Sequence, residues 1–163
     1  MEELSQNTND QVQFLTFTVG NEEYGIDIMK IREIKGWTQS TRLPNSPTYM
    51  CGVINLRGAI IPIFDLRARF EMGNTEADQK NVIIILSVGE RIIGILVDTV
   101  SDILNALSSA IKPAPNMDID VHKQFIEGLI SHEERMVVLL DIDKLFDDQI
   151  IESSFDATTE KNN

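Results

Sequence analysis

GVINLRGAIIPIFDLRARF, residues 52–70, decides the fold because a turn, a strand and a helix start follow one another within it. Residues 55–58 have turn chemistry and end on a glycine, which tolerates positive φ. Residues 59–64 are apolar without alternation, which predicts a strand covered on both faces. Pro62 lacks a backbone donor, so this strand should lie at a sheet edge or beside a bulge. Asp65 is a suitable N-cap for a short helical turn.

This segment returns later in the chain as a second copy. Aligned without a gap, the two segments place Gly52 on Gly128 and Phe70 on Phe146, and they keep the apolar strand positions and the helix cap in register. The alternating hairpin of residues 14–28 also returns, at positions 83–97, with Gly20 on Gly89. Matched glycines, core positions and caps indicate an internal duplication, with copy one at about residues 14–70 and copy two at about residues 83–146.

Within the hairpin, apolar and polar residues alternate, which is the pattern of half-buried strands. Leu15, Phe17 and Val19 are predicted to face the core, with the polar residues between them outward. Gly25 of the second strand is also predicted to face outward. Residues 28–34 have an apolar residue at every third position, and this spacing leaves a helical turn and a bent strand equally open.

Two copies of a hairpin, a connector and a further strand pair predict an all-β fold of two small units, each with about five strands. Because barrel closure removes exposed strand edges, we expect twin β-barrels related by a pseudo-twofold, with short helical turns and a groove between them. The strands at 59–64 and 136–140 would fill a barrel with one face and contact the other barrel with the opposite face. The pattern leaves open whether the barrels exchange strands.

The composition is that of a globular protein with an acidic surface. The chain has 163 residues and a formal net charge of −12, so the field of the whole molecule repels nucleic acid. Its apolar runs are too short to span a bilayer and its start lacks a secretion signal, so we expect a cytoplasmic protein without direct membrane insertion. Residues 13–148 are predicted to form the domain, between a flexible N-terminal tail at 1–12 and an acidic C-terminal tail at 149–163.

The sequence contains no residue pattern typical of catalysis. It lacks a phosphate-binding loop, a dinucleotide fingerprint, a nucleophile elbow and a histidine pair at metal-ligand spacing. Cys51 is the only cysteine and is expected to be a small packed thiol. The sequence therefore predicts that the protein is not an enzyme and holds neither a cofactor nor a metal ion.

The two copies differ most at the turn, which is where a function beyond folding is expected. Residues 55–58 read Asn-Leu-Arg-Gly, whereas residues 131–134 read Ser-His-Glu-Glu, so the cation Arg57 occurs in one copy only. Glu33 adds a carboxylate between isoleucines. Arginine beside apolar anchors is a common composition of a binding surface.

Five segments of the chain form a recognisable set: GIDIMKIREI from Gly25, GVINLRGAIIPIFDL from Gly52, GILVDTVSDIL from Gly94, IKPAP from Ile111 and LLDIDKLF from Leu139. Together they resemble the CheW family of bacterial chemotaxis coupling proteins. The resemblance runs from about residue 14 to residue 146. Its most specific part is the pattern Asn-Leu-Arg-Gly-x-Ile-x-Pro.

The resemblance implies a non-catalytic scaffold of two SH3-like five-stranded β-barrels related by a pseudo-twofold. Such a scaffold couples methyl-accepting chemoreceptors to the histidine kinase CheA and transmits receptor control of kinase activity. Its implied partners are the regulatory domain of CheA and the cytoplasmic hairpin tip of the receptor. Through the receptors it would be recruited to the inner face of the membrane.

The resemblance also implies residues for each contact. Ile28 and Ile31 match the apolar patch that binds the kinase. Glu33 and Arg57 are expected to pair with each other across a groove in which the helical tip of the receptor would lie. The complete set expected to form this receptor-binding groove is Glu33, Gly52, Asn55, Leu56, Arg57, Ile83, Gly94 and Val97.

Other functions stay as alternatives at this point. A CheW-like module could bind another two-component kinase, and a small β-barrel could bind a small ligand or an oligonucleotide. Oligonucleotide binding needs basic and aromatic strand faces, whereas the chain has 14 Lys and Arg against 26 Asp and Glu. An enzyme would need a cofactor-binding groove, which calorimetry with nucleotides and metal ions would detect.

Overall fold

The computed structural model describes residues 10–113, 125–147 and 150–151. In these parts the chain folds into strands joined by short helical turns, so the predicted all-β class is correct. The elements in chain order are β1 (Gln11–Val19), β2 (Glu22–Asp27), η1 (Ile28–Lys30), β3 (Ile31–Gly36), β4 (Met50–Leu56), β5 (Ala59–Asp65), α2 (Leu66–Arg69), β6 (Val82–Val88), β7 (Arg91–Val97), β8 (Thr99–Leu107), η2 (Ser108–Ala110), β9 (Ile126–His132), β10 (Arg135–Leu140) and α3 (Ile142–Leu145).

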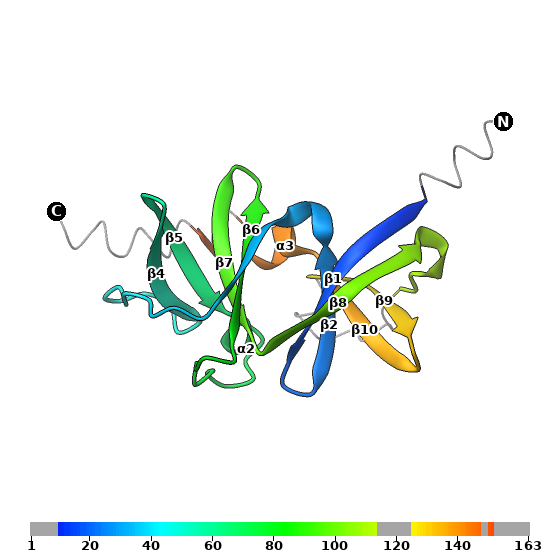
Figure 1. Ribbon diagram of the computed structural model, residues 1–163, viewed down its shortest axis with the longest axis horizontal. Coiled ribbons are helices and arrows are strands. Elements are labelled where there is room, and N and C mark those ends of the chain that lie inside the picture. The colour runs from blue at the N-terminus through cyan, green and yellow to red at the C-terminus, as the bar shows by residue number, and fades with distance from the viewer. Residues whose placement is uncertain (1–9, 114–124, 148–149, 152–163) are drawn as a thin grey trace.

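The strands form two five-stranded sheets, which curl into two small SH3-like barrels lying side by side (Figure 1). Barrel A has the strand order β8-β1-β2-β10-β9, and barrel B has the order β3-β6-β7-β5-β4. Each strand from β1 to β5 has a counterpart five numbers later, so that β1 corresponds to β6 and β5 to β10. Replacing every strand by its counterpart converts one strand order into the other. The two barrels are therefore related by the predicted pseudo-twofold.

The barrels exchange strands, which the repeat pattern left open. Copy one supplies β1 to β5 and copy two supplies β6 to β10, yet the first hairpin of each copy pairs with strands of the other copy. Each barrel therefore contains strands of both copies. The reason lies in the short crossings: η1 alone joins β2 to β3, and Asp98 alone joins β7 to β8, so each hairpin leads directly into the other barrel.

A glycine at the same place in each copy lets a strand of one copy lie against a strand of the other. Gly25 in β2 pairs with Leu139 in β10, and Gly94 in β7 pairs with Ile63 in β5. A Cβ at Gly25 would lie 3.0 Å from Leu139 Cδ2, and one at Gly94 only 2.5 Å from Ile63 Cδ1. Gly25 therefore faces the interior of barrel A. Its predicted outward orientation is wrong because a residue without a side chain leaves no hydrophobic signal.

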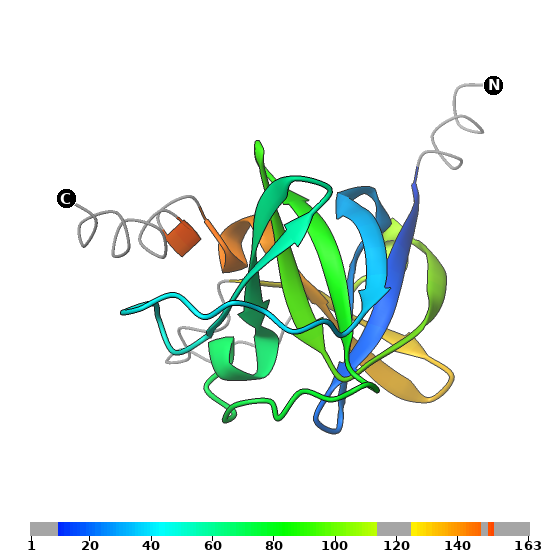
Figure 2. The same ribbon diagram turned by 60° about the vertical axis from the view of Figure 1, so that its left-hand side comes forward.

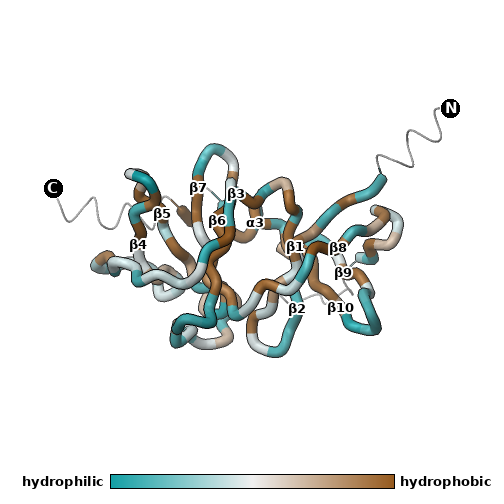
Figure 3. The backbone as a smooth tube through the Cα atoms, in the orientation of Figure 1, coloured by the Kyte–Doolittle hydropathy of each residue, from teal (hydrophilic) through white to brown (hydrophobic). Residues whose placement is uncertain are grey.

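Three clusters of buried apolar side chains form the core, one inside each barrel and the largest between the barrels. β5 places Ile63 inside barrel B and Phe64 in the central cluster, while β10 places Leu139 inside barrel A and Leu140 in the central cluster. The rings of Phe64 and Phe146 stack with centroids 4.9 Å apart. The predicted double role of these two strands is confirmed. Figure 3 shows polar residues gathered at the hairpin tips and apolar residues along the strands.

β1 is buried on both faces rather than half-buried. Leu15 and Phe17 lie in the central cluster as predicted, but Phe14 fills barrel A and Thr16 is only 1% exposed. The Thr16 hydroxyl donates to the carbonyl oxygen of Asp102 and accepts from its N–H, each at 3.2 Å. A polar residue is therefore buried here because the neighbouring strand β8 satisfies it.

β5 is an interior strand, so Pro62 does not mark a sheet edge. The alternative, a bulge, is correct: the register of β4 against β5 shifts between Met50 and Gly52, next to the position opposite Pro62. β7 pairs with β5 only beyond the proline, so no pairing with β7 is lost. The predicted cap is also present, because the Asp65 carboxylate accepts a hydrogen bond from Arg67 N at 3.1 Å.

The connection between β3 and β4 runs along barrel B (Figure 2). Thr41 and Val53 hold it by two backbone hydrogen bonds of 2.8 Å. The approach leaves no room at Gly52, whose φ is 148° and whose added Cβ would lie 2.4 Å from the carbonyl oxygen of Thr41. Copy two repeats this arrangement, with Lys112 lying against Gly128. Gly52 is therefore a requirement of folding.

Candidate functional site

The turn between β4 and β5 has the geometry of a tight hairpin. Leu56 pairs with Ala59, which leaves Arg57 and Gly58 as the turn residues, with φ values of 52° and 91°. Positive φ at both positions is the type I′ pattern, which matches the twist of the strands. The Asn55 side chain accepts a hydrogen bond from Gly58 N at 2.9 Å. The turn therefore presents the Arg57 side chain from a fixed backbone.

Arg57 and Glu33 form the predicted ion pair. Arg57 Nη2 lies 2.5 Å from Glu33 Oε1, with the two side chains 72% and 32% exposed. The hydrogen bond from Arg57 lowers the pKa of the Glu33 carboxyl. Because β3 and β4 are the two edge strands of barrel B, the pair spans the seam of this barrel. The pair links the turn to β3, and an exposed pair contributes little to stability.

Two exposed isoleucines lie near this ion pair along the chain, and Ile34 points to the face of β3 opposite Glu33 because successive strand side chains alternate. Ile34 follows Glu33 in β3 and is 46% exposed, and Ile60 near the turn is 61% exposed. The prediction that residues 59–64 are covered on both faces is wrong for Ala59 and Ile60, because the hairpin tip extends beyond the barrel. We call the ion pair and Ile60, which follows the same turn, the turn patch.

The structure brings only part of the predicted receptor-binding set to the surface. Asn55 and Arg57 have exposed side chains, Glu33 is half-buried, and Leu56 is half-buried against the interior of barrel B. The others are buried: Ile83 has no exposed surface, Val97 is 1% exposed, and Gly52 and Gly94 make close internal contacts. Ile83 and Val97 pack in the apolar clusters, and Gly52 lies against the backbone of Thr41 in the β3–β4 connection. None of the four presents a side chain at the surface. The receptor-binding role of the exposed residues stays a prediction.

The residues predicted to contact the kinase surround η1. Residues 28–34 contain both of the structures left open, a helical turn followed by a strand. Ile28 and Ile31 are half-buried, and Ile31 packs against the central cluster. Met29 between them is 83% exposed, and sequence reasoning missed it. It lines an open surface pocket of about 440 Å³ formed by Met29, Lys30, Ser87, Val88, Gly89, Asp143 and Asp147.

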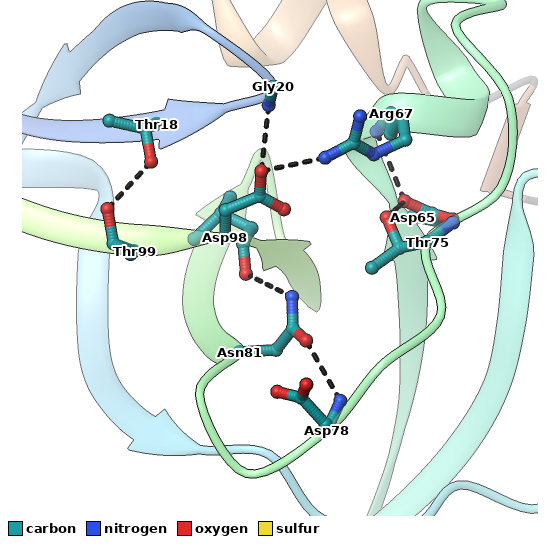
Figure 4. Close-up of polar contacts among 10 residues, drawn as sticks. Thr18, Gly20, Asp65, Arg67, Thr75, Asp78, Asn81, Asp98 and Thr99 are labelled. Atoms are coloured by element: carbon teal, nitrogen blue, oxygen red, sulfur yellow. Dashed lines mark hydrogen bonds and ion pairs between the residues drawn. The ribbon is translucent and has the colours of Figure 1, made fainter.

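The pseudo-twofold counterpart of this pocket is closed. The alignment of the two hairpins, which places Gly20 on Gly89, also places Met29 on Asp98. Asp98 Oδ2 accepts hydrogen bonds from Gly20 N at 2.8 Å and from Arg67 Nη2 at 2.7 Å (Figure 4). Gly20 also lies close to Arg67, whereas a Cβ at Gly89 would meet nothing within 4 Å. Polar contacts thus close the junction between β7 and β8, whereas the corresponding junction between β2 and β3 is open beside Met29.

Cys51 is the only free cysteine among the described residues and lies half-buried in β4. Burial raises the pKa of the Cys51 thiol to about 12, in agreement with a packed thiol. Residues 10–113, 125–147 and 150–151 contain no group of three histidine, cysteine or acidic residues placed to hold a metal ion. Nor does any helix in these ranges have the length and apolar character needed to cross a membrane. Nearly all of the predicted tails lies outside the described residues.

Two SH3-like barrels with exchanged strands, carrying exposed patches at the turn and at η1, define a twin-barrel binding domain. The chain belongs to the CheW-like family, whose domain model matches residues 13–149. The chain is 47% identical to the chemotaxis protein CheW of Klebsiella aerogenes over 82% of its own length and 80% of that protein. It is 32% identical to the chemotaxis protein CheW of Bacillus subtilis, over 87% of this chain and 91% of that one.

A solved structure agrees with this assignment. The scaffolding protein TtCheW of Thermoanaerobacter tengcongensis matches with a TM-score of 0.76 and 31% identity. The match covers 83% of this chain and 88% of that chain. Both the sequence and the fold therefore place the chain in one family along nearly all of its described length.

Proposed function

We propose that this chain is a non-catalytic chemotaxis scaffold, which couples methyl-accepting chemoreceptors to the histidine kinase CheA and transmits receptor control to the kinase. The observation that carries the proposal is the turn patch, an ion pair at a hairpin turn that the exposed Ile60 follows. Copy two has acidic residues at the corresponding turn, so folding alone does not require the patch. The proteins that this chain resembles are named as chemotaxis and scaffolding proteins.

The receptor contact is proposed at the turn patch. The cytoplasmic tip of a chemoreceptor is a helical hairpin, and a helix binds with apolar anchors at its centre and charged groups around them. Ile60 supplies apolar surface, and the pair of Arg57 and Glu33 supplies groups of both signs. Recruitment to the inner face of the membrane follows from this contact.

Reversing the charge of Arg57 is expected to weaken receptor binding about tenfold or more while the protein stays folded. Arg57 is 72% exposed, so Arg57→Glu removes no core contact. The measurement combines a thermal melt with a pull-down by a receptor cytoplasmic fragment. Lys80→Glu, an equal charge change on the loop before β6, is the control and should bind normally. Unfolding of Arg57→Glu together with lost binding would remove the support for a surface role.

The double variant Arg57→Glu with Glu33→Arg separates two roles of the ion pair. Restored binding means that the pair acts by holding the turn against β3. Binding that stays weak means that Arg57 contacts the receptor itself. Binding as strong as wild type in both single variants would contradict the proposed receptor surface.

The kinase contact is proposed at η1 with Ile28, Ile31 and the open pocket beside Met29. An unbranched apolar side chain that is 83% exposed can fill an irregular cavity in a partner. Lys30 forms a 2.7 Å ion pair with Asp143, and these two charged side chains lie at the same pocket as Met29. The partner would be the regulatory domain of CheA.

Met29→Glu is expected to reduce binding of the CheA regulatory domain about tenfold or more and to leave receptor binding unchanged. The exposed side chain contributes no core packing, so the melting temperature should stay within about 1 °C of wild type. Isothermal titration calorimetry with the isolated regulatory domain gives the affinity. Equal affinity of wild type and variant would place the kinase contact elsewhere.

Co-purification tests the two halves of the proposal together. The chain is mixed with a receptor cytoplasmic fragment and the CheA regulatory domain, and the mixture is separated by size-exclusion chromatography. A ternary complex is expected. If the chain bound the kinase domain but not the receptor fragment, it would couple the kinase to a protein other than a chemoreceptor. If it bound neither partner, the proposal would be contradicted.

A further inference from the structure

The corner of barrel A between the β1–β2 and β9–β10 turns holds a buried carboxylate that is not fully satisfied. Glu23 is 8% exposed, and its Oε1 makes no hydrogen bond to any described residue. The nearest cation is Arg135, whose Nε lies 3.7 Å from this oxygen. The Arg135 side chain is 60% exposed and is shared with Glu133, at 3.8 Å. A buried carboxylate oxygen without a donor destabilises the protein.

The counterpart corner in barrel B shows that folding does not require this carboxylate. The hairpin alignment relates Glu23 to Ile92, and the alignment that places Gly52 on Gly128 relates Arg135 to Ala59. Ile92 is half-buried and packs against the interior of barrel B. An apolar residue therefore serves at the same place in the same fold. The glutamate in barrel A has a cost that its counterpart avoids, which points to a role outside folding.

The surface around Glu23 is shaped as a shallow site. Glu23 lines an open pocket of about 360 Å³ together with Thr18, Gly20, Asn21, Glu22, Arg135 and Met136. Met136 is 51% exposed and supplies an apolar border. We call Glu22, Glu23, Glu133, Arg135 and Met136 the acidic corner. With three carboxylates and one guanidinium, its formal charge is −2.

We propose that the acidic corner binds a protein segment that presents a lysine or arginine beside an apolar side chain. The cation of the partner would enter the pocket and pair with the Glu23 carboxylate, which lines it, and its apolar neighbour would pack on Met136. Charge complementarity selects this partner, because a corner of charge −2 on a chain of charge −12 repels acidic segments and anionic surfaces. The corner is separate from the turn patch and from η1, so the inference does not depend on the proposed function.

The binding test uses the full chain and two peptides with blocked ends. The probe is Ala-Leu-Lys-Ala-Arg-Leu-Ala, and the control peptide has glutamate in place of its lysine and arginine. In ¹⁵N–¹H correlation spectra, the probe is expected to shift the amide signals of Glu22, Glu23, Arg135 and Met136 in a saturable manner. The acidic peptide should shift none of them. No shift with the basic peptide, or shifts spread evenly over the acidic surface, would overturn the proposal.

Glu23→Ile, which introduces the residue of the counterpart position, separates binding from a structural role. It is expected to weaken peptide binding about tenfold and to raise the unfolding midpoint by about 2–4 °C. Glu90→Gln on the β6–β7 hairpin changes the net charge equally and should alter neither quantity. A lower midpoint for Glu23→Ile would show that Glu23 serves folding through Arg135 and would overturn the proposal. Unchanged peptide binding by this variant would overturn it as well.

Discussion

Replacing Ile61 by aspartate is expected to lower the free energy of unfolding by about 5 kcal/mol. Ile61 is 3% exposed and lies in the cluster inside barrel B with Ile63 and Ile83. A carboxylate at this place would lose its hydration and gain no hydrogen-bond donor from these aliphatic side chains. Because many domains have a total stability of about 5–15 kcal/mol, we expect a largely unfolded variant in a circular-dichroism melt.

The preceding residue in the same strand gives a matched control. Ile60 is 61% exposed, so Ile60→Asp introduces the same charge into β5 but should cost less than about 1 kcal/mol. Ile61→Val, which removes one methylene without a charge, should cost about 0.5–1.5 kcal/mol. If Ile61→Asp and Ile60→Asp melted at the same temperature, the orientation of β5 described here would be wrong.

Gly52→Ala is expected to destabilise the protein by about 3 kcal/mol. Two costs combine at this position. The φ of 148° is rarely adopted by residues with a side chain, and the new Cβ would lie 2.4 Å from the carbonyl oxygen of Thr41. That oxygen is fixed by the hydrogen bonds between Thr41 and Val53, so it cannot move aside without breaking them. Urea unfolding curves of wild type and variant give the difference in free energy.

Gly58→Ala separates the two costs. Gly58 also has a positive φ, at 91°, but a Cβ there would meet nothing within 4 Å. Its substitution should cost about 1 kcal/mol, the cost of the backbone conformation alone. Equal destabilisation by the two alanine variants would mean that the close approach of Thr41 contributes nothing.

The duplication could be predicted because its signals are local. A helix cap such as Asp65 or a hairpin turn such as Gly20 depends on a few neighbouring residues, and the same local requirements return in copy two. Strand exchange could not be predicted, because apolar periodicity describes which face of a strand is buried and not which strand covers it. Which strand covers which depends on the direction in which η1 and Asp98 lead the chain from one barrel into the other.

The candidate site was predicted in part for a related reason. The resemblance to the family supplied the pair of Arg57 and Glu33, which is confirmed, but it could not supply exposure, so it included the buried Ile83 and Val97. Met29 was missed because an exposed methionine in an apolar run looks like a core residue. The copies held a usable signal: a position that is methionine in one copy and Asp98 in the other is seldom inside a core.

The central claim, that the chain couples receptors to the kinase, is tested most directly by CheA autophosphorylation. Purified CheA and receptor-containing membranes are assayed with and without the chain, in the presence and absence of a receptor ligand. We expect the chain to bring kinase activity under ligand control, and we expect Arg57→Glu to lose this effect while remaining folded. Kinase activity that is the same with and without the folded wild-type chain, and indifferent to ligand in both cases, would contradict the account.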